Sequence, residues 1–140
     1  MIFYLSQTKS ERTLFYKQSR ESVRNVLSSK FIEFNKTPYS KNSSDNFYNI
    51  KVHCFYDNDD MLQEIEIFEP NHVYVIGEVN FLGKQETEFE NYLSSLDMEY
   101  YSDKMGIVIE HLGISTVSSN NGKIECIYLD LEKSLYLNIY

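Results

Sequence analysis

Apolar residues recur at helical spacing near the start of the chain. Val23, Val26 and Leu27 fall on one face of a helix over residues 20–29, and Ser19 can accept a hydrogen bond from an otherwise free amide of its first turn. We therefore expect a short amphipathic helix here.

A second helix is predicted over residues 84–96. Phe89, Tyr92, Leu93 and Leu96 follow one another at i, i+3, i+4 and i+7, which aligns them along one face, while glutamates occupy the opposite face. This pattern is typical of a helix that packs one side on a core and leaves the other in water.

The rest of the chain favours β-strands, because apolar residues alternate with polar ones or form short runs bounded by turn residues. A loop is expected over residues 36–46. Asn121-Gly122 favours a type I′ hairpin turn, since both residue types tolerate positive φ. The expected strands are residues 1–6, 13–16, 31–34, 47–56, 62–68, 73–76, 79–82, 98–101, 106–110, 113–117, 123–130 and 135–140.

One predicted hairpin has the clearest alternation. After a turn at residues 57–60, Ile65 and Ile67 share one face of the next strand, while Glu64 and Glu66 share the other. We expect the isoleucines to pack on a core and the glutamates to form a line of carboxylates on the opposite side.

The two halves of the chain, residues 19–68 and 85–129, follow the same plan of a helix, extended segments, a polar turn and a strand. A tandem helix-plus-hairpin repeat explains this order. Chance agreement between two amphipathic patterns is the alternative, because few residues are identical. The aligned positions are Val23, Val26 and Leu27 with Phe89, Tyr92 and Leu93, and Glu64 and Ile65 with Glu125 and Cys126.

Length and composition favour one α+β domain over residues 1–140. A chain of 140 residues is long enough to bury a core. Its 12 tyrosines and 9 phenylalanines suit pleated sheets better than helices. The sequence therefore predicts a mainly antiparallel β-sheet with two short helices.

The chain has the features of a cytoplasmic protein. It contains no run of about 18 apolar residues that could span a bilayer, and residues 1–6 lack the basic lead and cleavage site of a signal peptide. Cys54 and Cys126 lie in apolar strand patterns without C-x-x-C spacing, so we expect buried free thiols. A disulfide between them would need an oxidising compartment.

Charge is distributed unevenly. The net charge is −8, yet residues 1–51 carry more positive than negative charge and the chain from Asp57 onward is strongly acidic. Because phosphate contacts require cations, this balance opposes direct nucleic-acid binding and suits a basic protein partner. A role in solubility alone is the alternative.

No metal or cofactor site is expected. Asp57, Asp59 and Asp60 resemble the start of a calcium loop, but the required glycine and the distal glutamate are missing, so a hairpin turn is favoured. The three histidines are scattered and form no pair with the spacing of zinc ligands.

The sequence does not indicate an enzyme. His53 and Cys54 are adjacent on a strand and so point to opposite faces, which excludes a nucleophile and base pair. Glu64 and Glu66 lie about 7 Å apart, within the range of paired-carboxylate hydrolases. Solvated strand glutamates are much more common, and no glycine-rich phosphate loop is present.

A binding surface is the remaining candidate. Acidic residues lie close to aromatic ones along one hairpin, and aromatic anchors with charged neighbours are typical of interfaces. An ordinary acidic sheet with core aromatics is the alternative. The candidate partner-binding residues are Tyr56, Asp57, Asp59, Asp60, Glu64, Glu66 and Glu69.

Two segments carry a resemblance to a known class of proteins. They are Ser19-x-x-Ser22-Val23-x-x-x-Leu27 and the run from Val52 to Phe68, which reads as an apolar strand, an acidic turn and an Ile-Glu pair. They resemble small bacterial immunity proteins encoded beside secreted or contact-dependent toxins. More distantly, residues 19–129 are similar to the duplicated helix-and-sheet architecture of the β-lactamase inhibitor protein.

The resemblance implies a cytoplasmic protein that occludes the active site of a cognate toxin. Many such toxins are nucleases, whose basic clefts would attract an acidic face. The alternative is a phage- or mobile-element-encoded nucleic-acid mimic that inhibits a host nuclease. A small enzyme or ligand-binding module would need a deep pocket, for which the sequence gives no sign.

Overall fold

The computed structural model of the protein describes residues 1–133 and 136–140. It contains two β-sheets and two α-helices, α1 (Arg20–Leu27) and α2 (Glu86–Ser95). The predicted fold class, a mainly antiparallel α+β protein with two short helices, is confirmed. The predicted strand over 135–140 begins at a residue outside the described part of the chain, and its remainder forms β12 (Tyr136–Ile139).

The larger sheet has eight antiparallel strands in the order β3-β4-β5-β6-β11-β10-β9-β8. Its first four strands and its last four each follow one another along the chain, so each half is a meander behind its own helix. The bounds are β3 (Ile32–Phe34), β4 (Ser44–Phe47), β5 (Val52–Tyr56), β6 (Leu62–Phe68), β8 (Tyr101–Ser102), β9 (Ile107–Ile109), β10 (Ile114–Ser118) and β11 (Ile124–Asp130). A 3₁₀ turn, η1 (Glu110–Leu112), joins β9 to β10.

The two meanders meet at β6 and β11, the central strands of the larger sheet. These strands pair antiparallel over five positions, with Ile65 opposite Leu129 and Ile67 opposite Ile127. All four side chains are at most 1 % exposed, so the seam between the halves is also part of the core. Burying four branched side chains fully contributes several kcal/mol by the usual transfer values, about 1.5–3 kcal/mol each.

The hairpin turns of the two halves have the same hydrogen bonds. Asp57 N donates to Met61 O at 2.8 Å, and Ser119 N donates to Lys123 O at 2.9 Å. A register shift also occurs at the corresponding point of each preceding strand, after Phe55 in β5 and after Val117 in β10. Strands β4, β5 and β6 of the first half therefore correspond to β9, β10 and β11 of the second at an offset of 62 positions.

The helices begin in the same way in both halves. Arg20 N donates to Asp60 O at 3.2 Å, and Glu86 N donates to Gly122 O at 2.8 Å. Asp60 and Gly122 both have left-handed backbones, with φ of 65° and 82°. The first residue of each helix is thus hydrogen-bonded to the turn that precedes the last strand of its own half.

This correspondence corrects one predicted alignment. Glu64 was expected to match Glu125, but the shared turn geometry equates Glu64 with Cys126, and Gln63 with Glu125. The helix alignment holds, since Val23 and Leu27 are buried on α1 as Phe89 and Leu93 are on α2. A slip by one residue would turn every side chain of the strand to the wrong face.

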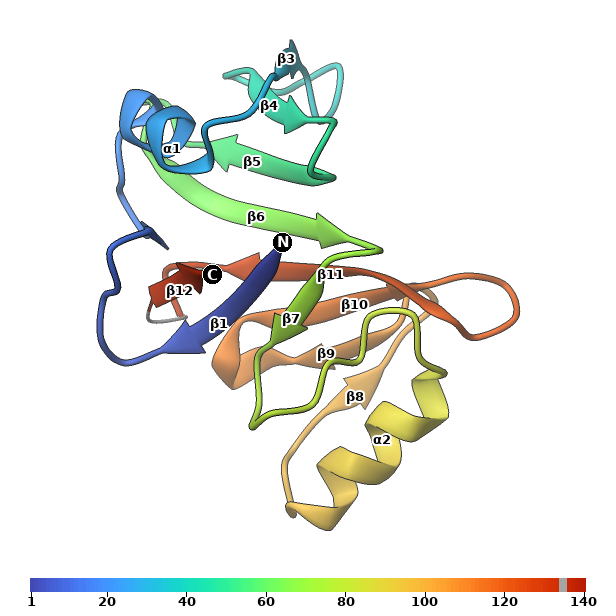
Figure 1. Cartoon of the computed structure of the whole chain (residues 1–140). Coiled ribbons are helices and arrows are strands. Elements are labelled where there is room, and N and C mark those ends of the chain that lie inside the picture. The colour runs from blue at the N-terminus through green and yellow to red at the C-terminus, as the bar shows by residue number, and fades with distance from the viewer. Residues whose placement is uncertain (134–135) are drawn as a thin grey trace.

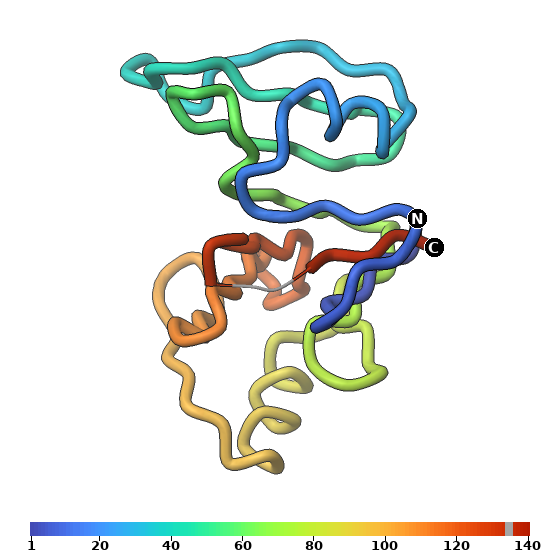
Figure 2. The backbone as a smooth tube through the Cα atoms, turned by 90° about the vertical axis from the view of Figure 1, so that its left-hand side faces the viewer, coloured from blue at the N-terminus to red at the C-terminus, as the bar shows by residue number. Residues whose placement is uncertain are grey.

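The smaller sheet has the strand order β2-β12-β1-β7. It brings together β1 (Ile2–Ser6), β2 (Thr13–Phe15), β7 (His72–Tyr74) and the final strand β12. Figure 1 shows β1 and β7 crossing in front of the strands of the larger sheet, with the helices at the two ends of this layer. Figure 2 shows the chain ends on the opposite side from the orange segment of β8 to β10.

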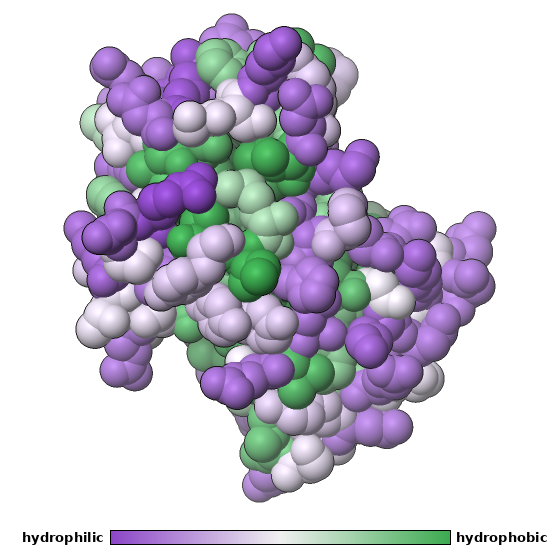
Figure 3. Space-filling model, in the orientation of Figure 1, coloured by the Kyte–Doolittle hydropathy of each residue, from purple (hydrophilic) through white to green (hydrophobic). Residues whose placement is uncertain are grey.

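One core lies between this layer and the larger sheet. It includes Val23 from α1, Phe89 from α2, Phe3 and Leu137 from the smaller sheet and Ile67 from the larger one, all at most 1 % exposed. Both helices and the smaller sheet therefore pack on the same face of the larger sheet. Figure 3 views the molecule from this covered side, where hydrophobic residues gather across the middle, with smaller groups near the top and the bottom.

Three predicted elements are wrong. The expected loop over 36–46 contains the start of β4, and the expected strand over 47–56 is broken by a turn in which Ile50 N donates to Phe47 O. Residues 79–82 form no strand, because the Asn80 side chain satisfies the amides of Val73 and Leu82.

Two predictions are corrected in detail. Asn121 has no positive φ, so the turn before β11 is not type I′ but a longer turn with Gly122 alone in the left-handed region. The strand expected over 98–101 is displaced to β8 at Tyr101–Ser102. Cys54 and Cys126 are buried and free, as expected.

Replacing Ile67 with Ala is expected to lower the free energy of unfolding by about 2–5 kcal/mol, because it opens a cavity at the seam between the halves. Ile32→Ala, at a site that is 55 % exposed on an edge strand, is the matched control and should change it by less than about 0.5 kcal/mol. Urea unfolding followed by circular dichroism measures both. Equal losses would show that the seam is not the stabilising contact.

Candidate functional site on the open sheet face

One face of the larger sheet is covered by neither helix nor the smaller sheet. Side chains alternate along a strand, so the register that puts Ile65 and Ile67 in the core turns Glu64 and Glu66 the other way. We call this surface the open face. Its side chains are Ile32, Phe34, Ser44, Asn46, His53, Phe55, Glu64, Glu66, Phe68, Cys126, Tyr128, Asp130, Ser115, Val117, Val108 and Tyr101.

The half of the open face formed by β3 to β6 carries an aromatic cluster. The ring of His53 lies 5.0 Å from that of Phe34 and 4.9 Å from that of Phe68, and Phe55 lies 6.1 Å from Phe34. These spacings are typical of favourable edge and tilted ring pairs. Phe34, His53 and Phe68 remain partly exposed, so the cluster presents a rigid apolar surface to solvent.

Carboxylates lie beside these rings at the centre of the open face. Glu64 is directly opposite Asp130 across the β6–β11 ladder, and Glu66 is opposite Tyr128. Like charges at opposite positions destabilise a sheet. The Tyr128 hydroxyl donates to Glu64, and Lys36 Nζ lies 3.5 Å from Glu64 Oε1. These two contacts offset the negative charge of Glu64. Glu66 and Asp130 form no salt bridge with any described residue.

Burial keeps the neighbouring titratable groups neutral. It raises the pKa of the Cys126 thiol, which the adjacent Glu66 raises further, and it raises the pKa of Tyr128 together with the hydrogen bond to Glu64. Burial also lowers the pKa of His53, and Glu66 opposes this only in part. The negative charge of this region therefore resides on its carboxylates at neutral pH.

The predicted acidic turn has a structural role. The Asp57 carboxylate accepts hydrogen bonds from the amides of Asp59 and Met61 at 2.9 and 3.0 Å. The bond from the Met61 amide is the main cause that lowers the pKa of Asp57, and Lys17 lies 3.4 Å away. Asp59 itself is exposed. Asp57 thus closes its own turn and pairs with Lys17.

A buried ion cluster lies on the core side of the same half. Asp45 is fully buried and accepts hydrogen bonds from Arg24 Nη2 at 2.8 Å, Arg24 Nε at 2.9 Å and the Tyr56 hydroxyl at 2.9 Å. Arg20 Nη1 lies 3.3 Å from it, and Arg20 Nε also pairs with Asp60 at 2.8 Å. These bonds fix α1 on its meander.

Tyr56 is the clearest correction among the predicted contact residues. It is 6 % exposed, its ring lies under the Arg20 guanidinium at 4.0 Å, and burial raises its pKa. A partner cannot reach it. Asp60 is occupied by Arg20 but keeps a side chain that is 55 % exposed.

The predicted set is therefore divided between two places. Glu64 and Glu66 lie on the open face, whereas Asp57, Asp59 and Asp60 lie in the turn before β6. Glu69 follows the far end of β6 and pairs with Lys123 at 3.2 Å. The sequence grouped these residues because they are neighbours in the chain, but a seven-residue strand separates the turn from Glu69.

Two hollows of similar size adjoin the open face. The first, about 450 Å³, lies between β4, β5 and the ends of β6 and β11, with Tyr48, His53 and Phe68 in its wall. The second, about 460 Å³, lies beside β8 and β9, with Tyr101 and Val108 in its wall.

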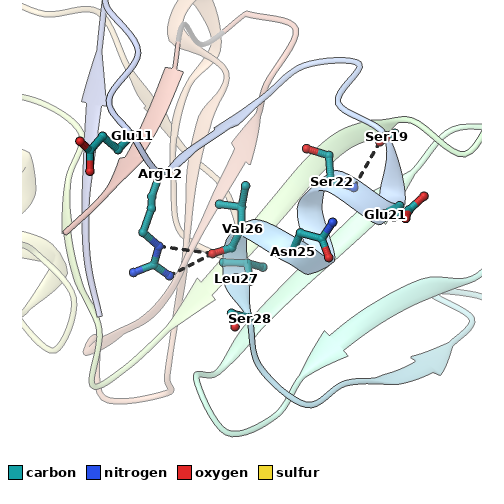
Figure 4. A pocket seen from close by; sticks show the side chains of 9 residues that line it. All are labelled: Glu11, Arg12, Ser19, Glu21, Ser22, Asn25, Val26, Leu27 and Ser28. Atoms are coloured by element: carbon teal, nitrogen blue, oxygen red, sulfur yellow. Dashed lines mark hydrogen bonds between the residues drawn. The ribbon is translucent and has the colours of Figure 1, made fainter.

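A larger groove of about 740 Å³ lies elsewhere, along α1 (Figure 4). Arg12 donates from Nε and Nη2 to Val26 O at 3.3 and 3.0 Å, and Ser19 Oγ accepts from Ser22 N at 3.2 Å as predicted for the helix cap. Arg12 thus ties the chain before β2 to the C-terminal end of the helix, where a cation is favourable. The Arg12 guanidinium therefore helps to hold α1 in place.

Comparison with family models, curated proteins and solved structures gives no match. Among the described residues, no helix is long and apolar enough to cross a membrane. The same residues contain no group of three or more His, Cys, Asp or Glu side chains arranged to hold a metal ion.

Sequence reasoning missed most of the open face. Phe34, His53 and Tyr128 come from three strands that are far apart in the chain, and nothing in a single strand shows that they are neighbours. The period-two pattern of β6 was the available signal, because it places Glu64 and Glu66 away from the core. To predict that β6 pairs with β11, one would need to know in advance how the strands of the two halves align.

Asp45→Asn is expected to lower the free energy of unfolding by about 3–5 kcal/mol, because it leaves two arginines without their buried counter-charge. Glu33→Gln is the control: this side chain is 57 % exposed and also contacts Arg24, but should cost less than about 1 kcal/mol. Chemical denaturation of both variants measures the difference. Similar small losses would refute a structural role for the cluster.

The pKa of His53 in the folded protein is expected to lie below its ordinary value of 6.5, because burial disfavours the charged form of the imidazole. The unfolded chain then binds the proton more readily than the folded protein does. The contribution of His53 to stability is therefore complete above pH 6.5 and is lost as the pH falls through the lowered pKa. NMR of the imidazole protons gives the midpoint. Glu66→Gln should lower it further and Phe34→Ala should raise it; shifts in the opposite directions would contradict this.

Proposed function

We propose that this protein binds and neutralises a cognate bacterial toxin, and that it does so with the open face. The observation that supports this most is the one-sided cover of the eight-stranded sheet, which leaves partly exposed aromatic rings and carboxylates side by side on rigid strands. A rigid surface loses little conformational entropy on binding. An inhibitor that must act before a toxin causes damage benefits from this property.

The aromatic cluster would supply the anchor of the interface. Phe34 and Phe68 are partly exposed and are held on both sides of His53, so their rings offer apolar area without rearrangement. Interfaces draw most of their energy from a few such residues near the centre. Lys36, which lies 4.3 Å over the ring of Phe55, would mark the edge of the anchor.

The carboxylates would supply orientation and speed of association. Glu66 and Asp130 have no cationic partner in the described chain and lie on the central strands beside the cluster. A basic surface on the partner would neutralise them and steer the encounter. This favours a nuclease as the toxin, because an enzyme that holds a phosphate backbone has a basic cleft.

The acidic turn takes a smaller part in this proposal than the sequence suggested. Asp57 is bonded to its own turn and Asp60 to Arg20, so their charge is already partly compensated. Glu64 and Glu66 remain from the predicted set as contact residues. The interface is accordingly centred on the aromatic cluster and the β6–β11 seam.

The double variant Glu66→Gln with Asp130→Asn is expected to slow association with the toxin and to reduce the salt dependence of binding, with little change in dissociation. Phe68→Ala should weaken the complex by about 2 kcal/mol or more, mainly through faster dissociation. Surface plasmon resonance at several salt concentrations, with the inactivated product of the adjacent gene as ligand, measures both rates.

Glu21→Gln with Glu88→Gln is the matched control, since these exposed glutamates lie on the two helices of the covered side and change the net charge equally. Equal effects of the two double variants would show that only net charge matters. Unchanged binding in Phe68→Ala would place the interface elsewhere. Inhibition of a host nuclease instead of the neighbouring toxin would favour the nucleic-acid mimic.

A further inference from the structure

The two hollows beside the open face are lined by similar kinds of side chains. The first is walled by Tyr48, His53 and Phe68 and bordered by Glu69 and Glu125. One lysine, at position 51, completes its charged border. The first hollow thus combines aromatic side chains, two glutamates and one lysine.

The second hollow repeats this set with other residues. Tyr100 and Tyr101 form its aromatic wall, and Glu99, Glu110 and Lys133 border it. The Lys133 ammonium donates to the backbone carbonyl of Glu110 at 3.3 Å and not to a carboxylate. Neither glutamate forms a salt bridge with a described residue.

The hollows also occupy related places in the two halves. Asn46 on β4 and Val108 on β9 correspond in the repeat, and Tyr48 and Glu110 correspond two residues later. Each of these residues lines its own hollow. Two of the seven residues that line each hollow therefore occupy corresponding positions in the two halves, whereas the others differ.

We propose that each hollow receives one arginine side chain of the bound toxin, so that two arginines bridge the two halves across the β6–β11 seam. This rests on the proposed function. A guanidinium is planar, stacks on aromatic rings and bonds to carboxylates through several N–H groups, which matches the wall and border of each hollow.

Charge supports an arginine rather than an anionic or apolar occupant. In the first hollow Glu69 is paired with Lys123, but Glu125 is exposed and forms no salt bridge with any described residue. In the second, Glu99 and Glu110 are exposed in the same way. Each hollow therefore offers at least one carboxylate that a guanidinium can neutralise without displacing an existing pair.

Two sites on one rigid sheet would act together. Once one arginine is bound, the other is held near its hollow at a high effective concentration, so a partner with both side chains binds more tightly than either contact alone allows. The distance between the hollows would also select partners whose two arginines have the matching separation.

The test is an NMR titration of the ¹⁵N-labelled protein with N-acetyl-arginine methylamide at millimolar concentrations. Backbone amides of both hollows are expected to shift. The citrulline analogue, which has the same shape without the charge, and the norleucine analogue should leave them unmoved. Shifts at one hollow only, or equal shifts with citrulline, would overturn the proposal.

Two single variants identify the carboxylate that binds arginine in each hollow. Glu125→Gln should weaken arginine binding about fivefold at the first hollow and leave the second unchanged, while Glu110→Gln should do the reverse. Both residues are exposed, so the fold should tolerate the changes. If neither variant alters its own hollow, the carboxylates are not the ligands and the proposal fails.

The same variants separate this inference from the proposed function. If the arginine probe misses both hollows while Phe68→Ala still weakens the toxin complex, the open face binds the toxin by other contacts and only the arginine sites are refuted. If the probe binds both hollows but the toxin does not bind the protein, the proposed toxin inhibitor is refuted.

Discussion

The pairing of β6 with β11 is the interaction on which the rest of the structure depends. Without it the chain would form two separate four-stranded meanders, each with one helix, and the side chains at the seam would lose the neighbours that bury them. The pairing joins them into one sheet of eight strands and places Ile65, Ile67 and their partners at its centre. It also creates the open face, because the same register turns the intervening carboxylates and rings away from the core.

The two halves share a backbone plan but hold their helices by different chemistry. Asp45, which binds the arginines of α1, corresponds in the repeat to Ile107, and both side chains are fully buried. α2 is held instead by packed aromatic rings, with the Phe81 ring 4.5 Å from that of Phe89 and tilted against it. A fold dictated by backbone hydrogen bonds at turns and helix starts tolerates this exchange, because either an ion cluster or an apolar cluster can fill the same space.

The sequence predicts local features well and distant ones poorly. Both helices, the Ser19 cap and the alternation around Ile65 follow from spacing alone, and the repeat was visible from the order of elements. β4 was missed because Asp45 makes it look like a loop; its burial depends on two arginines that only the folded chain brings near. The open face was predicted only in part, since its rings come from strands whose register no single segment determines.

The contrast between the helix attachments has a consequence for how the protein opens. Ion pairs depend on charge, whereas contacts between rings do not, so removing the Asp45 charge should loosen α1 on its meander while α2 stays in place. Amide hydrogen exchange would report this local opening around α1. The two halves of the larger sheet would in this way differ in how their helices respond to the loss of a single buried charge.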